Sequence, residues 1–232
     1  MTESAQPPTR ILIVDDQALQ RMGTRMFLAG QEGIEVVGES ADGGEAISQA
    51  EALAPDVVIM DVRMPGVDGI TATRRIVERK DDPASTPRVL LLTTFDLDEY
   101  VITGLEAGAS GFLTKDADPA DLLSAVRAVA AGDAVIAPSA TRRLLDRLAS
   151  AGGRTLSTHT QDRAAIEGLT ERERSILTAI GHGLTNAEIA QQLFLAESTV
   201  KSYVSRIFTK IGARDRVQAV IIAFQGGLIE LE

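Results

Sequence analysis

The sequence predicts an α/β domain, with a five-stranded parallel sheet and helices on both faces, followed by an all-α domain of four helices that contains a helix-turn-helix. Two observations support this. The first 130 residues alternate short aliphatic runs with amphipathic segments, and such βαβα alternation is typical of a parallel sheet covered on both faces. From about residue 166 the periodic segments all have helical spacing. A chain of 232 residues is also long enough for two domains.

The elements of the α/β domain follow from its apolar runs. Five strands are expected, at Arg10–Val14, Ile34–Glu39, Val57–Met60, Arg88–Leu92 and Gly111–Leu113. Helices are expected between and after them, at Ala18–Ala29, Gly44–Ala52, Ile70–Glu78, Glu99–Ala107 and Pro119–Ala131. In the last helix, Asp118 is placed to be the N-cap, Pro119 takes the first helical position, and Gly132 ends the helix.

The all-α domain carries clear helix-start signals. Thr170 and Glu173 have the spacing of a capping box, and so do Thr185 and Glu188. The predicted helices run from Thr170 to about Ile180, then over Asn186–Leu193, Glu197–Ile211 and Arg216–Phe224. The second and third are joined by a short turn, and the third is longer and basic, which is the pattern of a helix-turn-helix.

These signals divide the chain into four segments. Residues 1–8 are expected to be a disordered N-terminus, residues 9–132 the α/β domain, residues 133–165 a linker with a short helix near Thr141–Leu148, and residues 166–232 the helix-turn-helix domain.

Charge is distributed unevenly. The net charge is −10, but residues 1–132 carry 22 acidic and 11 basic side chains, whereas residues 166–232 carry 8 and 7. A near-neutral second domain with a local basic stripe is compatible with DNA binding. The chain has no cysteine, which fits a reducing cytoplasm, and no apolar run of about 18 residues that would predict a membrane span.

Polar residues end three of the predicted strands, where an open parallel sheet builds its sites. Asp15 and Asp16 follow the first strand, Asp61 follows the third, and Lys115 follows the fifth. Carboxylates at such an edge suit Mg²⁺ (or Mn²⁺) together with a phosphoryl group, which Lys115 would neutralise as a point charge. Acidic residues after strands are also common turn formers, so the prediction depends on their occurring together. Thr93, at the end of the fourth strand, offers a hydroxyl at the same edge.

Around these residues the chain resembles the receiver domain of two-component response regulators, over about residues 9–131. The resemblance lies in four segments, Val14–Asp16, Met60–Gly69, Leu92–Thr94 and Gly108–Lys115. It implies that Asp61 is the phosphoacceptor and that Mg²⁺ is held by Asp16, Asp61 and the carbonyl of Arg63, with Asp15 acting through water.

The same resemblance implies a switch role for two residues and a phosphoryl contact for a third. Thr93 would be the switch hydroxyl, with Thr94 as a close rival, and Phe112 the aromatic switch, although Phe112 could equally be an ordinary core residue. Lys115 would contact the phosphoryl group.

The predicted helix Glu197–Ile211 places apolar residues on one side and small hydroxyls mixed with basic residues on the others. This pattern suits contacts in a major groove, although an ordinary amphipathic helix would show it too. The C-terminal part is similar to the LuxR-type DNA-binding domain over about residues 167–230. The similar segments are Leu169–Glu173, Gly183–Ala190, Glu197–Lys201 and Lys210–Arg214.

This second resemblance implies that Glu197–Ile211 is the recognition helix. Lys201 and Val200 would face bases, and Thr199, Arg206 and Lys210 would lie nearer phosphates. Asn186 would cap its helix or contact the DNA backbone, and Arg216–Phe224 would lie at a dimer contact. Two residues depart from the family pattern: Tyr203 stands where histidine is frequent, though it could still reach a phosphate, and Ala196 replaces a frequent N-cap serine, at a cost of about 1 kcal/mol.

Together the two resemblances, in this order, imply a transcription regulator of the NarL/LuxR type. It would be phosphorylated by a sensor histidine kinase, would bind a double-stranded DNA operator as a homodimer, with the receiver as a further dimer contact, and would have no membrane partner. It would not be an enzyme beyond assisting its own phosphorylation and dephosphorylation. Two alternatives are an aspartyl-phosphate hydrolase, which Arg63 disfavours because it stands where a second acid is needed, and a DNA-binding protein with a vestigial receiver, which the intact acidic pocket disfavours.

Overall fold

The computed structural model describes residues 7–78, 86–93, 97–135 and 163–229. The chain divides into two compact units, Met1–Val135 and Ile136–Glu232, and each is described by itself. Four predictions fall wholly or partly outside the described residues: the disordered N-terminus of residues 1–8, the linker of residues 133–165, the short helix near Thr141–Leu148, and the rival switch hydroxyl of Thr94.

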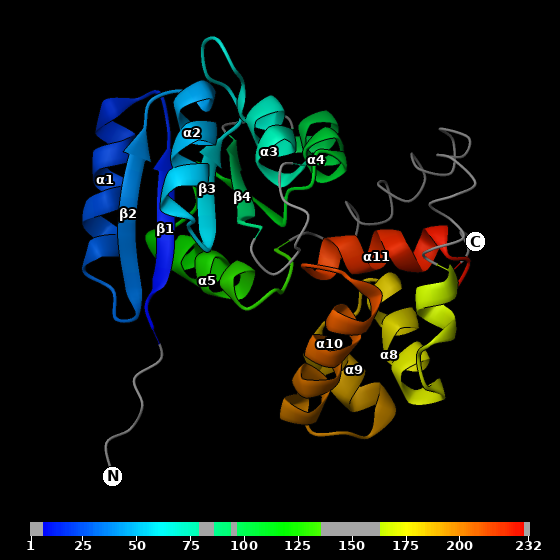
Figure 1. The fold of residues 1–232 in the computed structure, drawn as a ribbon. Helices are drawn as coiled ribbons and strands as arrows, with labels where there is room; N and C mark the ends of the chain where they lie inside the picture. Colours follow the sequence, from blue (N-terminus) through cyan, green and yellow to red (C-terminus); the bar gives the residue numbers. More distant parts are fainter. Residues whose placement is uncertain (1–6, 79–85, 94–96, 136–162, 230–232) are drawn as a thin grey trace. The chain divides into compact units, whose positions relative to one another are not determined.

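The first unit is the predicted parallel sheet (Figure 1). Its strands are β1 (Thr9–Val14), β2 (Ile34–Ser40), β3 (Val57–Asp61), β4 (Arg88–Thr93) and β5 (Gly111–Thr114). They lie in the order β2-β1-β3-β4-β5, and each neighbouring pair is parallel. The chain order therefore reverses beside β1 and β3, which is the point where open α/β sheets place a site at the carboxyl ends of their strands.

Helices cover both faces of this sheet. They are α1 (Ala18–Ala29), α2 (Gly43–Leu53), α3 (Gly69–Glu78), α4 (Leu97–Glu106) and α5 (Pro119–Ala130). Leu28 of α1 and Val126 of α5 share a buried cluster with Ile59 of β3, so α1 and α5 pack on the same face. On β4, Leu91 points to the other face, where it lies against Gly104 of α4.

The end of the first unit extends slightly beyond its predicted boundary. Gly132 has φ +86°, so it ends α5 as predicted. Asp118 occupies the N-cap position, but its side chain makes no capping hydrogen bond, contrary to the expectation. Val135 pairs with Gly111 of β5 through an isolated bridge, and its carbonyl accepts from the N–H of Phe112 at 2.9 Å.

The second unit is helical. Residues 163–167 are helical, and α8 (Glu171–Gly181), α9 (Asn186–Leu193), α10 (Glu197–Ile211) and α11 (Arg216–Gln225) follow. These four helices surround one buried core, to which each contributes aliphatic residues, for example Ile176, Ile189, Val204 and Ala219. The predicted bounds of α9 and α10 are confirmed.

Local capping explains why these helix bounds are predictable. Both predicted capping boxes are present, at Thr170 with Glu173 and at Thr185 with Glu188. Gly212 ends α10 in the left-handed conformation. Ala196, at the N-cap of α10, offers no side-chain bond, so this helix begins without the stabilisation that a serine would add.

Candidate functional site

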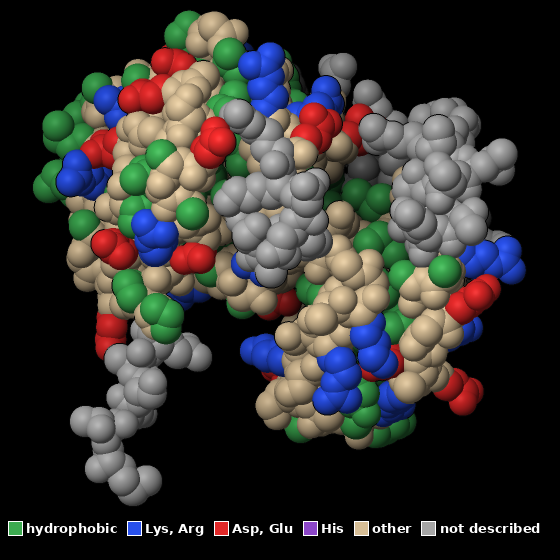
Figure 2. Space-filling model, viewed as in Figure 1, with side chains coloured by type: hydrophobic (Ala, Val, Ile, Leu, Met, Phe, Trp, Pro, Cys, Tyr) green, Lys and Arg blue, Asp and Glu red, His purple; other side chains and the backbone are tan. Residues whose placement is uncertain are grey.

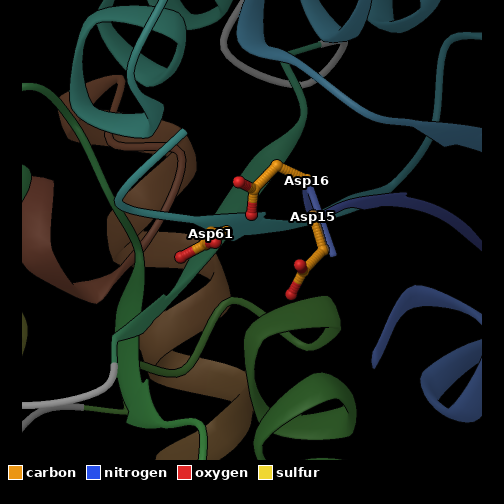
Figure 3. Close-up of side chains that lie close together, drawn as sticks. All are labelled: Asp15, Asp16 and Asp61. Carbon is orange, nitrogen blue, oxygen red and sulfur yellow. The ribbon is translucent and has the colours of Figure 1, made fainter. Parts of the chain in front are cut away.

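Three carboxylates meet at the carboxyl edge of the sheet (Figure 3). Asp15 and Asp16 follow β1, Asp61 is the last residue of β3, and one oxygen of each lies within 4.8 Å of one oxygen of the others. The sequence prediction that these residues converge is therefore confirmed in position. Asp15 and Asp61 are buried, with 5% and 4% of their surface exposed, whereas Asp16 is exposed.

Lys115 joins the two buried carboxylates. Its Nζ lies 2.8 Å from Oδ2 of Asp15 and 2.7 Å from Oδ2 of Asp61, across separations of 100 and 54 residues in the chain. Three carboxylates and one ammonium leave two negative charges when all are ionised, which suits a divalent cation. Carboxylate oxygens are also the ligands that Mg²⁺ prefers, so the donor set fits this ion.

Burial and pairing act against each other in this pocket. Burial raises the pKa of Asp61 above its ordinary value, although the hydrogen bond and the charge of Lys115 act to lower it. Burial acts to lower the pKa of Lys115, but hydrogen bonds to Asp15 and Asp61 outweigh it, so that the pKa of Lys115 is raised. Lys115 therefore stays charged across the physiological pH range.

Backbone groups orient the carboxylates further. The N–H of Gln17 donates to Oδ1 of Asp15 at 2.8 Å, and the N–H of Arg63 donates to Oδ1 of Asp61 at 3.2 Å. Arg21 of α1 donates to the carbonyl of Asp15 at 2.6 Å. Sequence reasoning missed Arg21 as a support of the pocket, and its position one turn into α1, close after two acidic residues, is the signal that could have indicated it.

Gly69 is a second support that sequence reasoning missed. It begins α3, and a Cβ added there would lie 1.9 Å from the carbonyl oxygen of Asp61. The N–H of Gly69 also donates to the carbonyl of Val62 at 2.9 Å. The start of α3 therefore rests directly on the end of β3, and no side chain fits between them.

The two residues expected to act as a switch lie beside the pocket. Thr93 ends β4 and is buried, and its carbonyl accepts from the N–H of Lys115 at 2.8 Å. Phe112 of β5 is also buried, and a Cβ added at Gly104 of α4 would lie 2.6 Å from its ring. The structure thus places Thr93 at the same edge as Asp61, and packs Phe112 against α4.

The exposed side of α10 carries three of the seven residues predicted to contact DNA, namely Lys201, Arg206 and Lys210. Ser202 and Ser205, which belong to the small hydroxyls expected on the polar faces of this helix, are exposed as well. Figure 2 shows Lys and Arg side chains gathered on the face of the second unit that includes α10.

Two basic residues of this face, Lys201 and Arg206, have partners within α10. Nζ of Lys201 lies 3.1 Å from Oε1 of Glu197, one turn before it, and Arg206 lies over the ring of Tyr203, 5.7 Å from its centroid. Thr199 is half-buried.

Val200 is a correction to the sequence prediction. Its side chain has no exposed surface and belongs to the core of the second unit. It therefore cannot face a base while this core is intact. The apolar stripe of α10 and its DNA-facing side are separate faces, and Val200 lies on the first.

Asn186 and Lys210 have partners within the domain. Oδ1 of Asn186 accepts from Arg216 at 3.1 Å, and Arg216 also donates to the carbonyl of Leu184. Nζ of Lys210 lies 2.8 Å from Oε2 of Glu173. Sequence reasoning assigned Glu173 only to the capping box, because no local pattern connects it to a lysine 37 residues away.

Comparison with known proteins agrees with this two-part architecture. Residues 11–127 match the family described as the response regulator receiver domain, and residues 167–223 match the family of bacterial regulatory proteins, luxR family. The chain is 39% identical to the response regulator protein VraR of Staphylococcus aureus over 222 residues, which cover 95% of this chain and 99% of VraR. This chain is a LuxR-family two-component response regulator.

A second relative spans both domains of this response regulator, and a solved structure covers part of the chain. The transcriptional regulatory protein LiaR of Bacillus subtilis is 37% identical over 220 residues, which cover 95% of this chain and 99% of LiaR. Among solved structures, a two-component response regulator of the LuxR family from Aurantimonas sp. SI85-9A1 aligns with a TM-score of 0.53 and 35% identity, over 61% of this chain and 99% of that one. The protein is thus a transcriptional regulator with a receiver and a LuxR-type DNA-binding domain. Within the described residues, no helix has the length and apolar character needed to cross a membrane.

Proposed function

We propose that this response regulator is a transcription factor controlled by phosphorylation of Asp61, with a sensor histidine kinase as the phosphoryl donor. The observation that carries the proposal is the position of the Asp61 carboxylate. It is buried at the carboxyl end of the central strand β3, 2.7 Å from the ammonium of Lys115, with two further carboxylates beside it. The other charged groups at this edge would hold a metal ion or neutralise the phosphoryl group on Asp61.

The proposed ligands of the metal ion are Asp16, Asp61 and the backbone carbonyl of Arg63, with Asp15 acting through a water molecule. Mg²⁺ or Mn²⁺ fits the carboxylate donors of this pocket. When bound, the ion would offset the negative charge of the transferring phosphoryl group. The exposure of Asp16 supports its direct role, because an ion that keeps several waters needs an open side.

In the proposed transfer, a carboxylate oxygen of Asp61 attacks the phosphorus of a phosphohistidine on the kinase. The new P–O bond forms as the P–N bond to the imidazole breaks, and the electron pair stays on the imidazole. Lys115 then moves its contact from Asp61 to the phosphoryl oxygens, as a point charge. The receiver assists this step and the later hydrolysis of its own acyl phosphate, and it turns over no separate substrate.

We further propose that the phosphoryl group is sensed by Thr93 and Phe112. The hydroxyl of Thr93 would hydrogen-bond a phosphoryl oxygen, since Thr93 ends the strand next to Asp61. Phe112 packs against Gly104, so a change in its position would be transmitted to α4. The new charge would in this way favour one of two arrangements of the receiver surface.

The test of the phosphoacceptor uses Asp61→Asn, which keeps the size of the side chain and removes the nucleophile. Each full-length protein is mixed with Mg²⁺ and a small-molecule phosphodonor and weighed by mass spectrometry. We expect the wild-type chain to gain one phosphoryl group and Asp61→Asn to gain none. Asp116→Asn is the matched control, because Asp116 is an exposed aspartate at the same sheet edge and should behave as wild type. A phosphoryl group on Asp61→Asn would show that the acceptor is elsewhere.

For the DNA-binding domain, we propose that α10 is the recognition helix. Lys201 would contact base edges, and Thr199, Tyr203 and Arg206 would lie nearer phosphates. The exposed basic side chains on this face support the proposal. A homodimer would bind two half-sites, with α11 at the dimer contact and the receiver as a further contact. The proposed domain limits are residues 9–132 and 166–232, joined by a linker, and the proposed location is the cytoplasm.

The test of base reading compares Lys201→Ala with Arg163→Ala. Both residues form exposed pairs with a glutamate four residues away, at 3.1 and 3.4 Å. An operator is first found by selection, and binding to it and to scrambled DNA is then titrated at several salt concentrations. Lys201→Ala should lower operator affinity by about 1–3 kcal/mol and flatten discrimination at one base pair per half-site. Arg163→Ala should leave discrimination intact. Equal losses on both DNAs would make Lys201 a phosphate contact instead.

A further inference from the structure

The last turn of the recognition helix is tied to the first turn of another helix by a buried charge. Nζ of Lys210, in the last turn of α10, lies 2.8 Å from Oε2 of Glu173, the third residue of α8. The side chain of Glu173 is 2% exposed and that of Lys210 is 39% exposed. In this pair the carboxylate is buried, whereas both side chains of the pair between Lys201 and Glu197 are exposed.

Oε2 of Glu173 is also part of the capping box. The same oxygen accepts from the N–H of Thr170 at 2.9 Å and from its hydroxyl at 2.9 Å. Each charge lies at the helix end that favours it, since the carboxylate is in the first turn of α8 and the ammonium in the last turn of α10. The ammonium of Lys210 is therefore committed to a contact inside the domain, and is not simply a solvated cation available to a phosphate.

The first turn of α8 also fixes the other helix of the helix-turn-helix. Arg172, the neighbour of Glu173, donates to the carbonyl of Leu193 at the end of α9, at 2.8 Å. The first turn of α8 thus contacts the C-terminal end of α9 through Arg172 and the C-terminal end of α10 through Glu173. Both contacts are polar and directional, whereas apolar packing between helices is in general compatible with a range of crossing angles.

We propose that Lys210 is a positioning residue for DNA reading, which holds the tilt of the recognition helix through Glu173, and that it is not a phosphate contact. This inference rests on the proposed role of α10. Lys201 and Lys210 are nine residues apart, about 13 Å along the helix. A tilt of about 10° at one end therefore moves the other by roughly 2 Å, which is more than the roughly 0.5 Å that a working contact tolerates. Binding to scrambled DNA should be affected less by such a shift, because it depends on electrostatic attraction to phosphates and not on contacts with particular bases.

A positioning role and a phosphate-contact role for Lys210 predict different effects of Glu173→Gln on DNA binding. If Lys210 positions α10, then Glu173→Gln and Lys210→Met should have the same effect, because each removes the ion pair. Glutamine keeps the acceptor that the capping box needs. If Lys210 binds a phosphate, Glu173→Gln should leave DNA affinity unchanged or raise it, because it releases the ammonium for DNA.

The experiment uses the full-length chain, the selected operator and scrambled DNA, each titrated at several salt concentrations. The variants are Lys210→Met, Glu173→Gln, the double variant and Lys210→Arg, with Arg206→Met as the reference for loss of an exposed cation of α10. Each variant is first shown by circular dichroism to be folded at the assay temperature. The readout is the ratio of the two affinities in one sample, which an unfolded fraction does not change, because it scales both affinities equally.

We expect Lys210→Met and Glu173→Gln each to lower the operator-to-scrambled ratio by about 10-fold, the cost of one disturbed base contact per site. The double variant should lose no more than either single variant, since all three lack the same pair. Lys210→Arg should retain most of the wild-type operator-to-scrambled ratio. The slope of log affinity against log salt should stay at the wild-type value, whereas Arg206→Met should reduce it by about 0.9 per monomer.

Two results would overturn this inference and leave the proposed role of α10 intact. In one, Lys210→Met reduces the salt slope as Arg206→Met does, while Glu173→Gln keeps full affinity. In the other, every variant keeps the wild-type ratio, so that the pair serves stability only. A folded wild-type chain that prefers no DNA sequence would instead overturn the proposed role of α10, and the inference with it.

Discussion

Asp15 and Asp16 are adjacent in the chain and have different surroundings. Asp15 is buried and is paired with Lys115 at 2.8 Å, while its other oxygen accepts from the N–H of Gln17. Asp16 is exposed. Consecutive side chains at the end of a strand point in different directions, so one faces the lysine and the other faces solvent. Two residues of the same type can therefore have separate roles toward a metal ion.

We predict that Mg²⁺ binding depends more on Asp16 than on Asp15. Asp16→Ala removes a proposed direct ligand, whereas Asp15→Ala removes an anchor for a bound water, a change that typically costs about 10- to 100-fold in metal affinity. Asp16→Ala should lose more affinity for Mg²⁺ than Asp15→Ala, and Asp116→Ala should bind Mg²⁺ as the wild-type chain does. Isothermal titration calorimetry on each full-length variant measures this, and equal or reversed losses would contradict the ranking.

At the scale of elements, the pocket depends on how closely α3 approaches β3. Gly69 begins α3 with its Cα directly beside the carbonyl of Asp61. At Gly23, in the middle of α1, the position that a Cβ would take has no atom within 4 Å apart from its chain neighbours and the nearby backbone of its own helix. One glycine is therefore required by packing, and the other only weakens its helix.

We predict opposite effects for alanine at these two glycines. Gly69→Ala places a methyl group 1.9 Å from the Asp61 oxygen, so it should destabilise the receiver by about 1–3 kcal/mol or more and reduce phosphorylation of Asp61. Gly23→Ala should stabilise the receiver by about 0.5–1 kcal/mol, because alanine is the better helix former. Urea denaturation followed by circular dichroism measures both. A neutral Gly69→Ala would mean that the start of α3 can move away from β3 at little cost.

At the scale of the whole molecule, the two units differ in charge and each has its own core. The acidic excess lies in residues 1–132, whereas the helical unit is nearly neutral with a basic face on α10. Its ion pair between Glu173 and Lys210 lowers the pKa of Glu173 from 4.5 to about 2, through the hydrogen bond from Lys210 and then those from Thr170. The stability of the second unit should therefore depend on pH through Glu173.

The direction of this dependence follows from the lowered pKa. The contribution of ionised Glu173 to stability is fully present above pH 4.5, its pKa in the unfolded chain, and is lost as the pH falls toward about 2. We predict that Glu173→Gln melts at a lower temperature than the wild-type chain at pH 7, and that the difference shrinks between pH 4.5 and pH 2.

The measurement uses the tyrosines as reporters. The chain has two tyrosines and no tryptophan, so Tyr100→Phe leaves Tyr203 of α10 to report on the second unit by fluorescence. Thermal melts of this background, with and without Glu173→Gln, give the difference at each pH. A difference that stays constant from pH 7 to pH 2 would show that the charge of Glu173 contributes nothing to stability.

The sequence by itself determined the order of the elements, their bounds to within two residues, and the residues that meet at the edge of the sheet. Helix starts such as Thr170 and Thr185 are predictable because a capping box is made within four residues. The convergence of Asp15, Asp61 and Lys115 is predictable because parallel strands end at the same edge. Asp118 marks the limit of this reasoning, since its N-cap position was correct but its side chain makes no capping bond.

Only the tertiary structure decided which partner each polar group has. Lys115 bonds to both Asp15 and Asp61, Lys210 is held by Glu173, and Gly69 touches the backbone of Asp61. Val200 turned out to be core, although its place on the apolar stripe of α10 was readable from helical spacing. These contacts join residues distant in sequence, and they depend on how helices pack against one another and against the sheet. Local spacing carries no information about such packing, because the same amphipathic helix can meet its neighbours at several angles.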